Sequence, residues 1–276
     1  MIARVGQKAH NLARLVRCEL GTPPFLVLPA DGAADPMIHG VPIHENLHTQ
    51  LLGLSATEQT TWAVRSSAIM YDSQNRLYSE DNAKFSTAGW FRTELNVPYK
   101  DLPRAIDSVR RAVRAPHVQK LASHFGVDPT RIETAIILQP FLVAQASAVV
   151  FLKSPFPAQL GSILICGCFG ACIGLVHGQI TGDQIWINRA SGQISRVTVT
   201  KPIEFTSEPN GGLCEQDVEF GRQNEPALLE DDVRSIQRLV SQIEAEFGND
   251  QVLELVKSRE IWIPVQCRPA PPARTG

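Results

Sequence analysis

The sequence predicts an α+β protein built as two lobes around a cleft. The chain has 276 residues, which is long for one compact domain and comfortable for two lobes. Apolar runs expected as strands and periodic runs expected as helices are mixed along it, without the regular strand–helix–strand alternation of a doubly wound sheet. Hydrophobic residues make up 43% and charged residues 20%, as in a globular protein that buries a core.

We expect the first lobe to span residues 1–133 and the second lobe residues 134–269, with a flexible tail over residues 270–276. In the first lobe we predict a helix over residues 11–16, a strand over 25–28, irregular chain over 30–54, and a strand from 62 that ends at Arg65. A second helix is expected to be capped by Asp101 and to bury Leu102, Ile106, Val109 and Val113.

In the second lobe the clearest helix is predicted over residues 230–247. Its apolar residues repeat at spacings of three and four, acidic residues crowd its start, and Gly248 follows its end. Strands are predicted over residues 135–138, 148–152, 162–165, 184–188, 253–255 and 261–265.

Composition excludes several classes of partner. A net charge of −2 gives no electrostatic reason to expect nucleic acid or an anionic membrane. The six cysteines lack disulfide-framework spacing, so we expect a reducing cytoplasm. Cys166, Cys168 and Cys172 lie in an apolar run and are expected in the core rather than on a metal. The apolar residues 163–176 are too few to span a bilayer, and the charges in residues 1–17 lead us to expect no signal peptide.

Two segments of the first lobe suit an anion. Gly6 precedes Lys8 at the start of the predicted helix, where backbone amides and an ammonium can point at a phosphate. Arg65 is followed by Ser66 and Ser67, and a guanidinium fork beside hydroxyl donors can also hold a phosphate. A solvated lysine and an ordinary surface arginine are the alternatives for each segment alone.

Two further segments suit a nucleotide. Residues 85–97 contain a loop of small residues around Gly89, followed by Thr93, and such a loop lets backbone amides approach phosphates closely. The apolar strand over residues 136–141 ends in Gln139 and a proline, which suits a hinge between the lobes. A plain turn and an ordinary strand end are the alternatives.

The closing strands carry a candidate metal site. Glu254 lies on the first of them, and Gln266 and Arg268 share one face of the second. An acid and an amide oxygen from adjacent strands can bind Mg2+ when phosphates and waters complete its octahedron. The arginine beside them can hold a phosphate as charge shifts. A surface salt bridge is the alternative.

Taken in order, these segments resemble the ATP-grasp nucleotide-binding domain of the pyruvate phosphate dikinase and phosphoenolpyruvate synthase family, to which rifampin phosphotransferases also belong. The motifs are Gly-x-Lys, Arg-Ser-Ser-Ala, Ala-Gly-x-x-x-Thr-x-Leu-Asn-Val, an apolar strand with Gln, then Glu, then Gln-x-Arg-Pro. Each is weakly specific alone, but their joint order covers residues 5–269. The resemblance implies a two-lobed ATP-grasp fold with the nucleotide cleft between the lobes.

The resemblance also implies that ATP and Mg2+ are the cofactors. It implies contacts to them from Lys8, Arg65, Gly89, Thr93, Gln139, Glu254, Gln266 and Arg268. Lys8, Arg65 and Arg268 are the implied catalytic residues, and Glu254 and Gln266 are the implied metal ligands.

Three positions depart from the family pattern. The family usually has Gln-Asp-Ile-Glu before the closing strands, and here Val252 replaces the aspartate, which argues against a full two-metal arrangement. The family's Gly-Leu-Gly-Glu segment loses its glutamate at Ile173. The acidic pair that follows Arg-Ser-Ser-Ala is reduced to Tyr71 and Asp72.

The resemblance implies a dikinase-type phosphotransferase. Family enzymes also carry a swivelling domain with a phosphorylatable histidine and a domain for the acceptor, and we expect neither after Pro269. The expected acceptor is a small molecule or a histidine on a separate carrier protein, with neither nucleic acid nor membrane as a partner. An ATP-grasp ligase that forms an acyl phosphate and a nucleotide-binding subunit without turnover are the alternatives.

Overall fold

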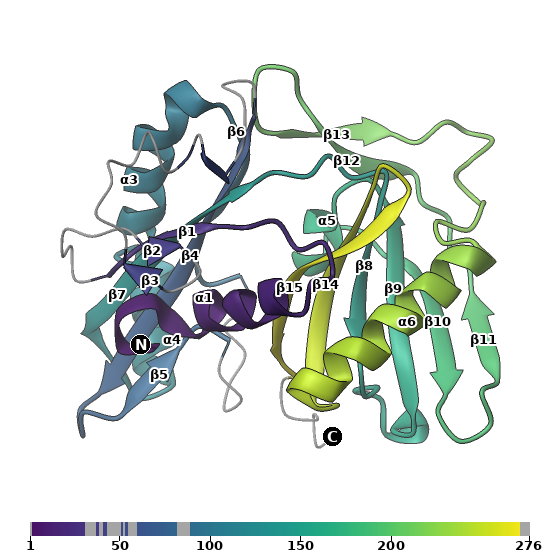
Figure 1. Cartoon of the computed structure of the whole chain (residues 1–276), viewed down its shortest axis with the longest axis horizontal. Helices are drawn as coiled ribbons and strands as arrows, with labels where there is room; N and C mark the ends of the chain where they lie inside the picture. The colour runs from purple at the N-terminus through teal and green to yellow at the C-terminus, as the bar shows by residue number, and fades with distance from the viewer. Residues whose placement is uncertain are drawn as a thin grey trace. The chain divides into compact units, whose positions relative to one another are not determined.

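The computed structural model describes residues 2–30, 37–38, 41–42, 51, 53–54, 60–81 and 89–270. The chain forms two compact units (Figure 1). Unit 1 comprises Met1–Arg17, Pro23–Phe141 and Ser207–Leu213, and unit 2 comprises Cys18–Thr22, Leu142–Thr206 and Cys214–Gly276.

Unit 1 is built on a seven-stranded antiparallel sheet in the order β3-β2-β1-β7-β4-β5, with β6 also paired to β4. Its strands are β1 (Leu26–Leu28), β2 (Met37–Ile38), β3 (Val41–Pro42), β4 (Trp62–Asp72), β5 (Leu77–Ser79), β6 (Thr93–Val97) and β7 (Val127–Pro140). Its helices are α1 (Ile2–Arg17), the 3-10 turn η1 (Tyr99–Asp101), α3 (Leu102–Ala112) and α4 (Pro116–His124).

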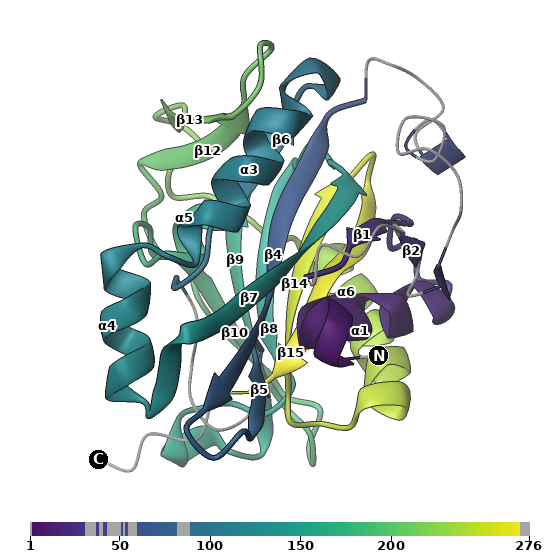
Figure 2. The same ribbon diagram turned by 90° about the vertical axis from the view of Figure 1, so that its left-hand side faces the viewer.

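Helices cover both faces of this sheet. Figure 2 shows α3 and α4 on one side of β4 and β7, and α1 on the other side. Val64 and Met70, which lie on one face of β4, belong to the apolar clusters that α3 and α4 complete. Ser67 lies on the opposite face and bonds α1. Accordingly β4 is buried along nearly its whole length, and β7 is buried over residues 134–139.

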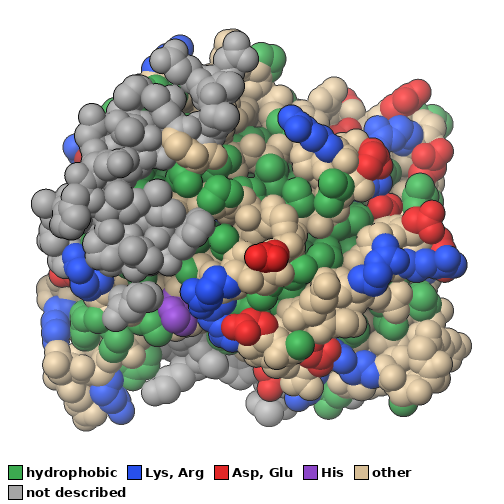
Figure 3. Space-filling view, in the orientation of Figure 1, with side chains coloured by type: hydrophobic (Ala, Val, Ile, Leu, Met, Phe, Trp, Pro, Cys, Tyr) green, Lys and Arg blue, Asp and Glu red, His purple; other side chains and the backbone are tan. Residues whose placement is uncertain are grey.

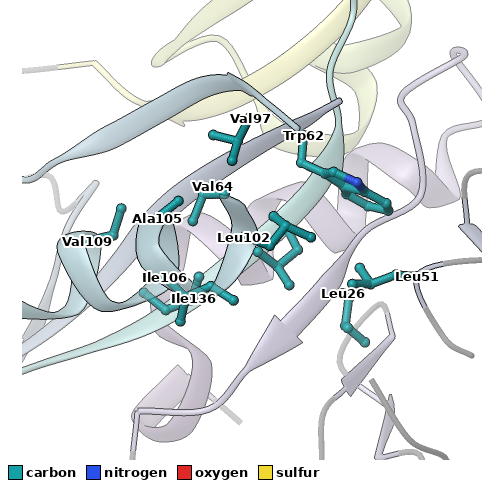
Figure 4. Close-up of a cluster of buried hydrophobic side chains, with 11 residues drawn as sticks. Leu26, Leu51, Trp62, Val64, Val97, Leu102, Ala105, Ile106, Val109 and Ile136 are labelled. Atoms are coloured by element: carbon teal, nitrogen blue, oxygen red, sulfur yellow. The ribbon is translucent and has the colours of Figure 1, made fainter. Parts of the chain in front are cut away.

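The main core of unit 1 lies between α3 and the sheet (Figure 4). Trp62 is 1% exposed and packs with Val64, Ile136 and the apolar face of α3. Leu102, Ile106 and Val109 are buried on that face, as the spacing predicts. Asp101 occupies the N-cap position of α3 as predicted, but its side chain makes no capping hydrogen bond. Pro103 supplies the first-turn conformation.

Unit 2 is built on a six-stranded antiparallel sheet in the order β11-β10-β9-β8-β14-β15. Its strands are β8 (Ala146–Phe151), β9 (Ser162–Phe169), β10 (Asp183–Asn188), β11 (Ile194–Val197), β14 (Gln251–Ser258) and β15 (Ile261–Pro269). The strands β12 (Ile203–Ser207) and β13 (Leu213–Asp217) pair separately. The remaining elements are η2 (Pro157–Gln159), α5 (Ile173–Val176) and α6 (Glu230–Phe247).

The helix predicted over residues 230–247 is confirmed, and α6 lies across the strands of unit 2 (Figure 1). Asp232 fastens it at its first turn. One carboxylate oxygen accepts hydrogen bonds from Trp262 Nε1 at 2.9 Å and from Lys257 Nζ at 3.1 Å, and the other accepts from the Leu229 amide at 2.9 Å. Burial raises the pKa of Asp232, but these partners outweigh it, so its pKa is lowered overall.

Replacing Asp232 with alanine is expected to lower the free energy of unfolding by about 1–3 kcal/mol, because the buried Trp262 indole and the Leu229 amide at the helix start lose their acceptor. Since the folded pKa is lowered, this stabilisation is present above the ordinary aspartate pKa and is lost as the pH falls through the folded value. Urea unfolding between pH 3 and pH 7 measures both effects. If the wild type and Asp232→Ala lost the same amount of stability on acidification, Asp232 would not be the source of this pH-dependent stabilisation.

Several expectations about element ends need correction. The strand that starts at Trp62 does not end at Arg65 but continues to Asp72, and the first helix spans Ile2–Arg17 rather than residues 11–16. The predicted lobe boundary between residues 133 and 134 falls inside β7, and the compact units divide after Phe141 instead. The irregular chain expected over residues 30–54 and the tail lie largely outside the described residues.

The surface and the cysteines give few functional signals. Acidic and basic side chains are interspersed over the described part of the face in Figure 3, and neither sign forms a continuous patch there. Within the described ranges no helix is long and apolar enough to cross a membrane.

Cys168 is buried as expected, whereas Cys166 and Cys172 are half-buried. Burial raises the pKa of the Cys166 thiol to about 11, so it is a poor nucleophile.

Candidate functional site

The eight candidate residues divide between the two units. Unit 1 carries Lys8 on α1, Arg65 on β4, Gly89 before β6, Thr93 at the start of β6, and Gln139 on β7. Unit 2 carries Glu254 on β14, and Gln266 and Arg268 on β15.

Strand register collects three of the unit 1 residues on one face of the sheet. Arg65 is the direct cross-strand partner of Thr93 on β6 and of Ile137 on β7. Gln139 lies two residues from Ile137 and therefore on the same face. This is also the face that α1 covers, because Ser67 lies two residues beyond Arg65 and accepts a hydrogen bond from α1. The side chains of Arg65, Thr93 and Gln139 therefore lie on the sheet face that α1, the helix of Lys8, covers.

A glycine sets the path of α1 over that face. Gly6 interrupts the helix with φ 75° and ψ 167°, a conformation reserved for glycine. A Cβ at this position would lie 2.4 Å from Ser67 Oγ and 2.7 Å from the Ser67 carbonyl oxygen. The Ala9 amide donates to Ser67 Oγ at 3.1 Å, so this amide serves docking rather than pointing at an anion as predicted. The Gly-x-Lys motif therefore seats α1 on β4.

Lys8 is held by a buried carboxylate that the sequence analysis missed. Its Nζ forms an ion pair with Oε1 of Glu80, which follows β5, and their side chains are only 7% and 8% exposed. Oε2 of Glu80 accepts from Ser66 Oγ at 2.9 Å and from the Ala68 amide at 3.2 Å. One carboxylate therefore links α1 to the Arg-Ser-Ser-Ala segment of β4.

Asp72 and the acidic residues that follow β5 have different roles. Asp72 was taken as the remnant of the acidic pair, but it organises the turn between β4 and β5, where it accepts hydrogen bonds from Arg76, Gln74 and Tyr78. Burial opposes ionisation of Asp72, but these hydrogen bonds outweigh it and lower its pKa to about 2. The hairpin displaces an acidic pair to Glu80 and Asp81, which are both buried. The Glu-Asp pair ahead of residues 85–89 was the available signal.

Two more residues of the motifs have clear partners in unit 1. Gln139 is 2% exposed and donates through Nε2 to the Pro23 carbonyl at 3.0 Å. Asn96, from the Leu-Asn-Val part of the motif, donates through Nδ2 to the carbonyls of Glu208 and Gly212 at 2.8 Å each. Asn96 thereby holds the turn between β12 and β13, a role its motif did not reveal.

The loop predicted to lie over the phosphates is only partly described. Gly89 has φ 77°, and a Cβ built on it meets no described atom within 4 Å. Residues 85–88 of the same motif lie outside the described residues.

In unit 2 the predicted metal pair is formed by direct cross-strand neighbours. Glu254 pairs with Gln266, and Val252 pairs with Arg268. Opposite residues of an antiparallel pair project from the same face with Cβ atoms about 4.5–5.5 Å apart. Leu255 and Lys257 lie on the other face, where Lys257 contacts α6 through Asp232. Glu254, Gln266 and Arg268 therefore share the face that α6 leaves uncovered.

This arrangement fits one magnesium ion held mainly by its substrate. A carboxylate and an amide supply hard oxygen ligands, and Mg2+ commonly takes one or two protein ligands beside phosphates and waters. Among the described residues no group of three His, Cys, Asp or Glu side chains could hold a metal by itself. Val252 is 1% exposed and offers no ligand beside Glu254. Glu254 and Gln266 therefore suit an Mg2+ ion that is bound together with the nucleotide. They do not suit a site in which protein side chains supply all the ligands.

Comparison with known proteins identifies the domain. The family model described as "Pyruvate phosphate dikinase, AMP/ATP-binding domain" matches residues 42–274. A "Prodigiosin synthesizing transferase PigC" of Serratia marcescens is 24% identical over 96% of this chain and 31% of its own length. A "Rifampicin phosphotransferase" of a Streptomyces species is 25% identical over 84% of this chain and 26% of its own length.

Two further matches are a phosphoenolpyruvate synthase and a solved ligase structure. A "Probable phosphoenolpyruvate synthase" of Methanothermobacter thermautotrophicus is 26% identical over 70% of this chain and 27% of its own length. The solved L-amino acid ligase of Bacillus licheniformis aligns with 98% of this chain and 43% of its own, at 12% identity and a TM-score of 0.38, which is too low to support an argument. The chain thus spans a third or less of the curated relatives it matches.

The family model covers most of the chain and includes seven of the eight candidate residues, all except Lys8. It confirms the ATP-grasp fold class that the sequence predicts, and it makes an adenine nucleotide the ligand class. The chain belongs to the pyruvate phosphate dikinase AMP/ATP-binding domain family.

Proposed function

We propose that this chain binds MgATP and acts as a dikinase-type phosphotransferase module, which passes a phosphoryl group to a small molecule or to a histidine on a separate carrier protein. The observation that supports it most is the cross-strand pairing of Glu254 with Gln266, beside Arg268, in a chain of this family. Relatives named as phosphotransferases and as a phosphoenolpyruvate synthase support the same reaction class.

Phosphoryl transfer depends mainly on positioning and charge neutralisation, and the candidate residues suit that task. Lys8 and Arg65 supply positive charge from unit 1, and Arg268 supplies it from unit 2. Thr93, opposite Arg65, adds a hydroxyl donor for a phosphate oxygen. Glu254 and Gln266 would hold Mg2+, which when bound neutralises phosphate charge. Gln139 is the proposed nucleotide contact on β7.

A nucleotide-binding subunit without turnover is the second candidate. Val252 motivates it, because an apolar side chain lies opposite Arg268 where the family usually has aspartate. Loss of that carboxylate leaves the proposed metal pair with one acid. Binding of ATP without its consumption in the presence of every acceptor and carrier tested would favour this candidate.

Calorimetric titration of ATP with Mg2+ tests the binding proposal. Arg65→Ala and Glu254→Ala are each expected to weaken ATP binding tenfold or more, because each removes a charge-assisted contact to phosphate or metal. Arg104→Ala, which removes an exposed arginine of α3, is the matched control and should bind as wild type does. Absence of ATP binding by the wild type would refute the proposed function.

Product analysis then separates the reaction classes. With cell extract as the source of acceptor, a phosphotransferase should form ADP or AMP only when extract is present. A ligase would instead require a carboxylate together with an amine or thiol co-substrate. Product formation that depends on such a pair would replace the phosphotransferase proposal with the ligase.

A further inference from the structure

We propose that Glu80 is a positioning residue, which holds the Lys8 ammonium where it meets the phosphates of the bound nucleotide and which acts on the nucleotide only through Lys8. This inference rests on the proposed function. It gives Glu80, which follows the β4–β5 hairpin, a role in phosphate binding. This role is indirect, because the Glu80 carboxylate itself repels phosphate.

The contacts of Glu80 make it a junction between two candidate phosphate-binding segments. Oε1 pairs with Lys8 on α1, and Oε2 accepts from Ser66 Oγ and the Ala68 amide on β4. The backbone adds a further bond, from the Glu80 amide to the Ala68 carbonyl at 2.9 Å. Because Ser66 follows Arg65 directly, the carboxylate sets Lys8 relative to the strand that carries Arg65.

Lys8 keeps donors for a second partner. An ammonium has three N–H donors, and Glu80 is its only recorded hydrogen-bond acceptor in the part of the chain that the structure describes. Two donors therefore remain for phosphate oxygens while the ion pair persists. Protein kinases use the same chemistry, since an ion pair between a lysine and a glutamate must be in place for that lysine to hold the nucleotide phosphates.

Stability alone does not account for a charged pair at this place. A buried ion pair is generally no more stable than apolar side chains of similar volume, because both charges lose their hydration. The neighbouring parts of α1 and β4 are buried, since Val5, Ala9 and Ala68 are at most 2% exposed. A buried lysine without its carboxylate would swing toward water or lose its proton. Glu80 prevents both outcomes and keeps a charged, oriented ammonium.

Calorimetric titration of MgATP and of adenosine into the full chain tests the proposal. Glu80→Gln is expected to weaken ATP binding about tenfold and to leave adenosine binding unchanged, because adenosine has no phosphates for Lys8 to meet. Lys8→Met is expected to give the same loss. The double variant should lose no more than Lys8→Met alone, since Glu80 acts through Lys8. A purely structural role would weaken both ligands.

Controls keep the test decisive. Glu133→Gln, an exposed glutamate of β7, makes the same change in net charge and should leave both affinities unchanged. ATP binding that stays equal or tightens in Glu80→Gln, or losses that add in full in the double variant, would overturn the positioning role. If Glu80→Gln does not fold, Ser66→Ala removes one bond to Glu80 and must still lower the ATP-to-adenosine affinity ratio. Failure of the wild type to bind ATP would instead refute the proposed function.

Discussion

Replacing Asp183 with alanine is expected to lower the free energy of unfolding of unit 2 by about 3–5 kcal/mol, because it leaves the Lys201 ammonium buried without its carboxylate. Asp183 begins β10, and its Oδ1 lies 2.7 Å from Lys201 Nζ, with side chains only 1% and 2% exposed. Oδ1 also accepts from the Val199 amide at 3.0 Å, and Oδ2 accepts from the Ala227 amide at 2.7 Å. The carboxylate thus ties two chain segments, residues 199–201 and the segment at Ala227, to the sheet.

Lys201 depends on this carboxylate more than on any other described partner. Its Nζ donates also to the Val199 carbonyl at 2.7 Å and lies 5.5 Å from the centroid of the Phe169 ring. A carbonyl and a ring face cannot neutralise a buried ammonium as a carboxylate does. The cost therefore arises mainly from the lysine that remains and less from the contacts removed.

Urea unfolding of three variants measures this cost. The double variant with Asp183→Ala and Lys201→Met should recover part of the lost stability, because the unpaired charge is gone. Asp107→Ala breaks an exposed pair with Arg111 at 2.8 Å on α3 and should change stability too little to resolve. A double variant no more stable than Asp183→Ala would show that the amide bonds to Asp183, rather than the ion pair, carry the effect.

Helices with a strong apolar period could be predicted well from the sequence. In α6, Val233, Ile236, Val240 and Ile243 are buried at the predicted spacing, and the predicted start and end of the helix are both correct. The face of α3 was predicted for the same reason. Both helices pack one stripe on a sheet, so the periodicity of their sequence reports their burial directly.

Strands buried on both faces were harder to delimit. β4 lies between helices on two sides, so its polar residues are buried and do not mark solvent exposure. Arg65, Ser66 and Ser67 were therefore taken as the end of a strand, although they lie in its middle and are all at most 8% exposed. The lobe boundary was displaced for a different reason: the first half of β7 carries the exposed residues Thr130, Arg131 and Glu133, so its sequence lacks the apolar pattern of a buried strand.

The sequence suggests which residues form the candidate site, but it does not predict their contacts. The pairing of Glu254 with Gln266 follows from two adjacent strands, and their register confirms that they are direct neighbours. Glu80 could not be found by spacing, because the hairpin over residues 69–79 separates it from Arg-Ser-Ser-Ala. Only the fold returns Glu80 to Ala68, where its amide bonds the Ala68 carbonyl.

Replacing Gly6 with alanine is expected to destabilise unit 1 by about 2–6 kcal/mol and to weaken ATP binding as well. Backbone strain at this φ and ψ costs about 1–3 kcal/mol, and overpacking adds about 1–3 kcal/mol. The added Cβ would lie 2.4 Å from Ser67 Oγ and 2.7 Å from a backbone oxygen of β4. Because β4 is paired on both sides, α1 must move, and Lys8 moves with it.

Matched glycine variants separate the two sources of this cost. Gly126→Ala places alanine at φ 73° with no atom of the described residues within 4 Å, so it measures backbone strain without a clash. Gly6→Ala combined with Ser67→Gly removes the Oγ contact but retains the carbonyl contact, and should recover only part of the loss. Thermal unfolding and ATP titration of these variants provide the measurements. If Gly6→Ala costs no more than Gly126→Ala, then α1 is not seated against β4 through Gly6, and the Gly-x-Lys motif needs another explanation.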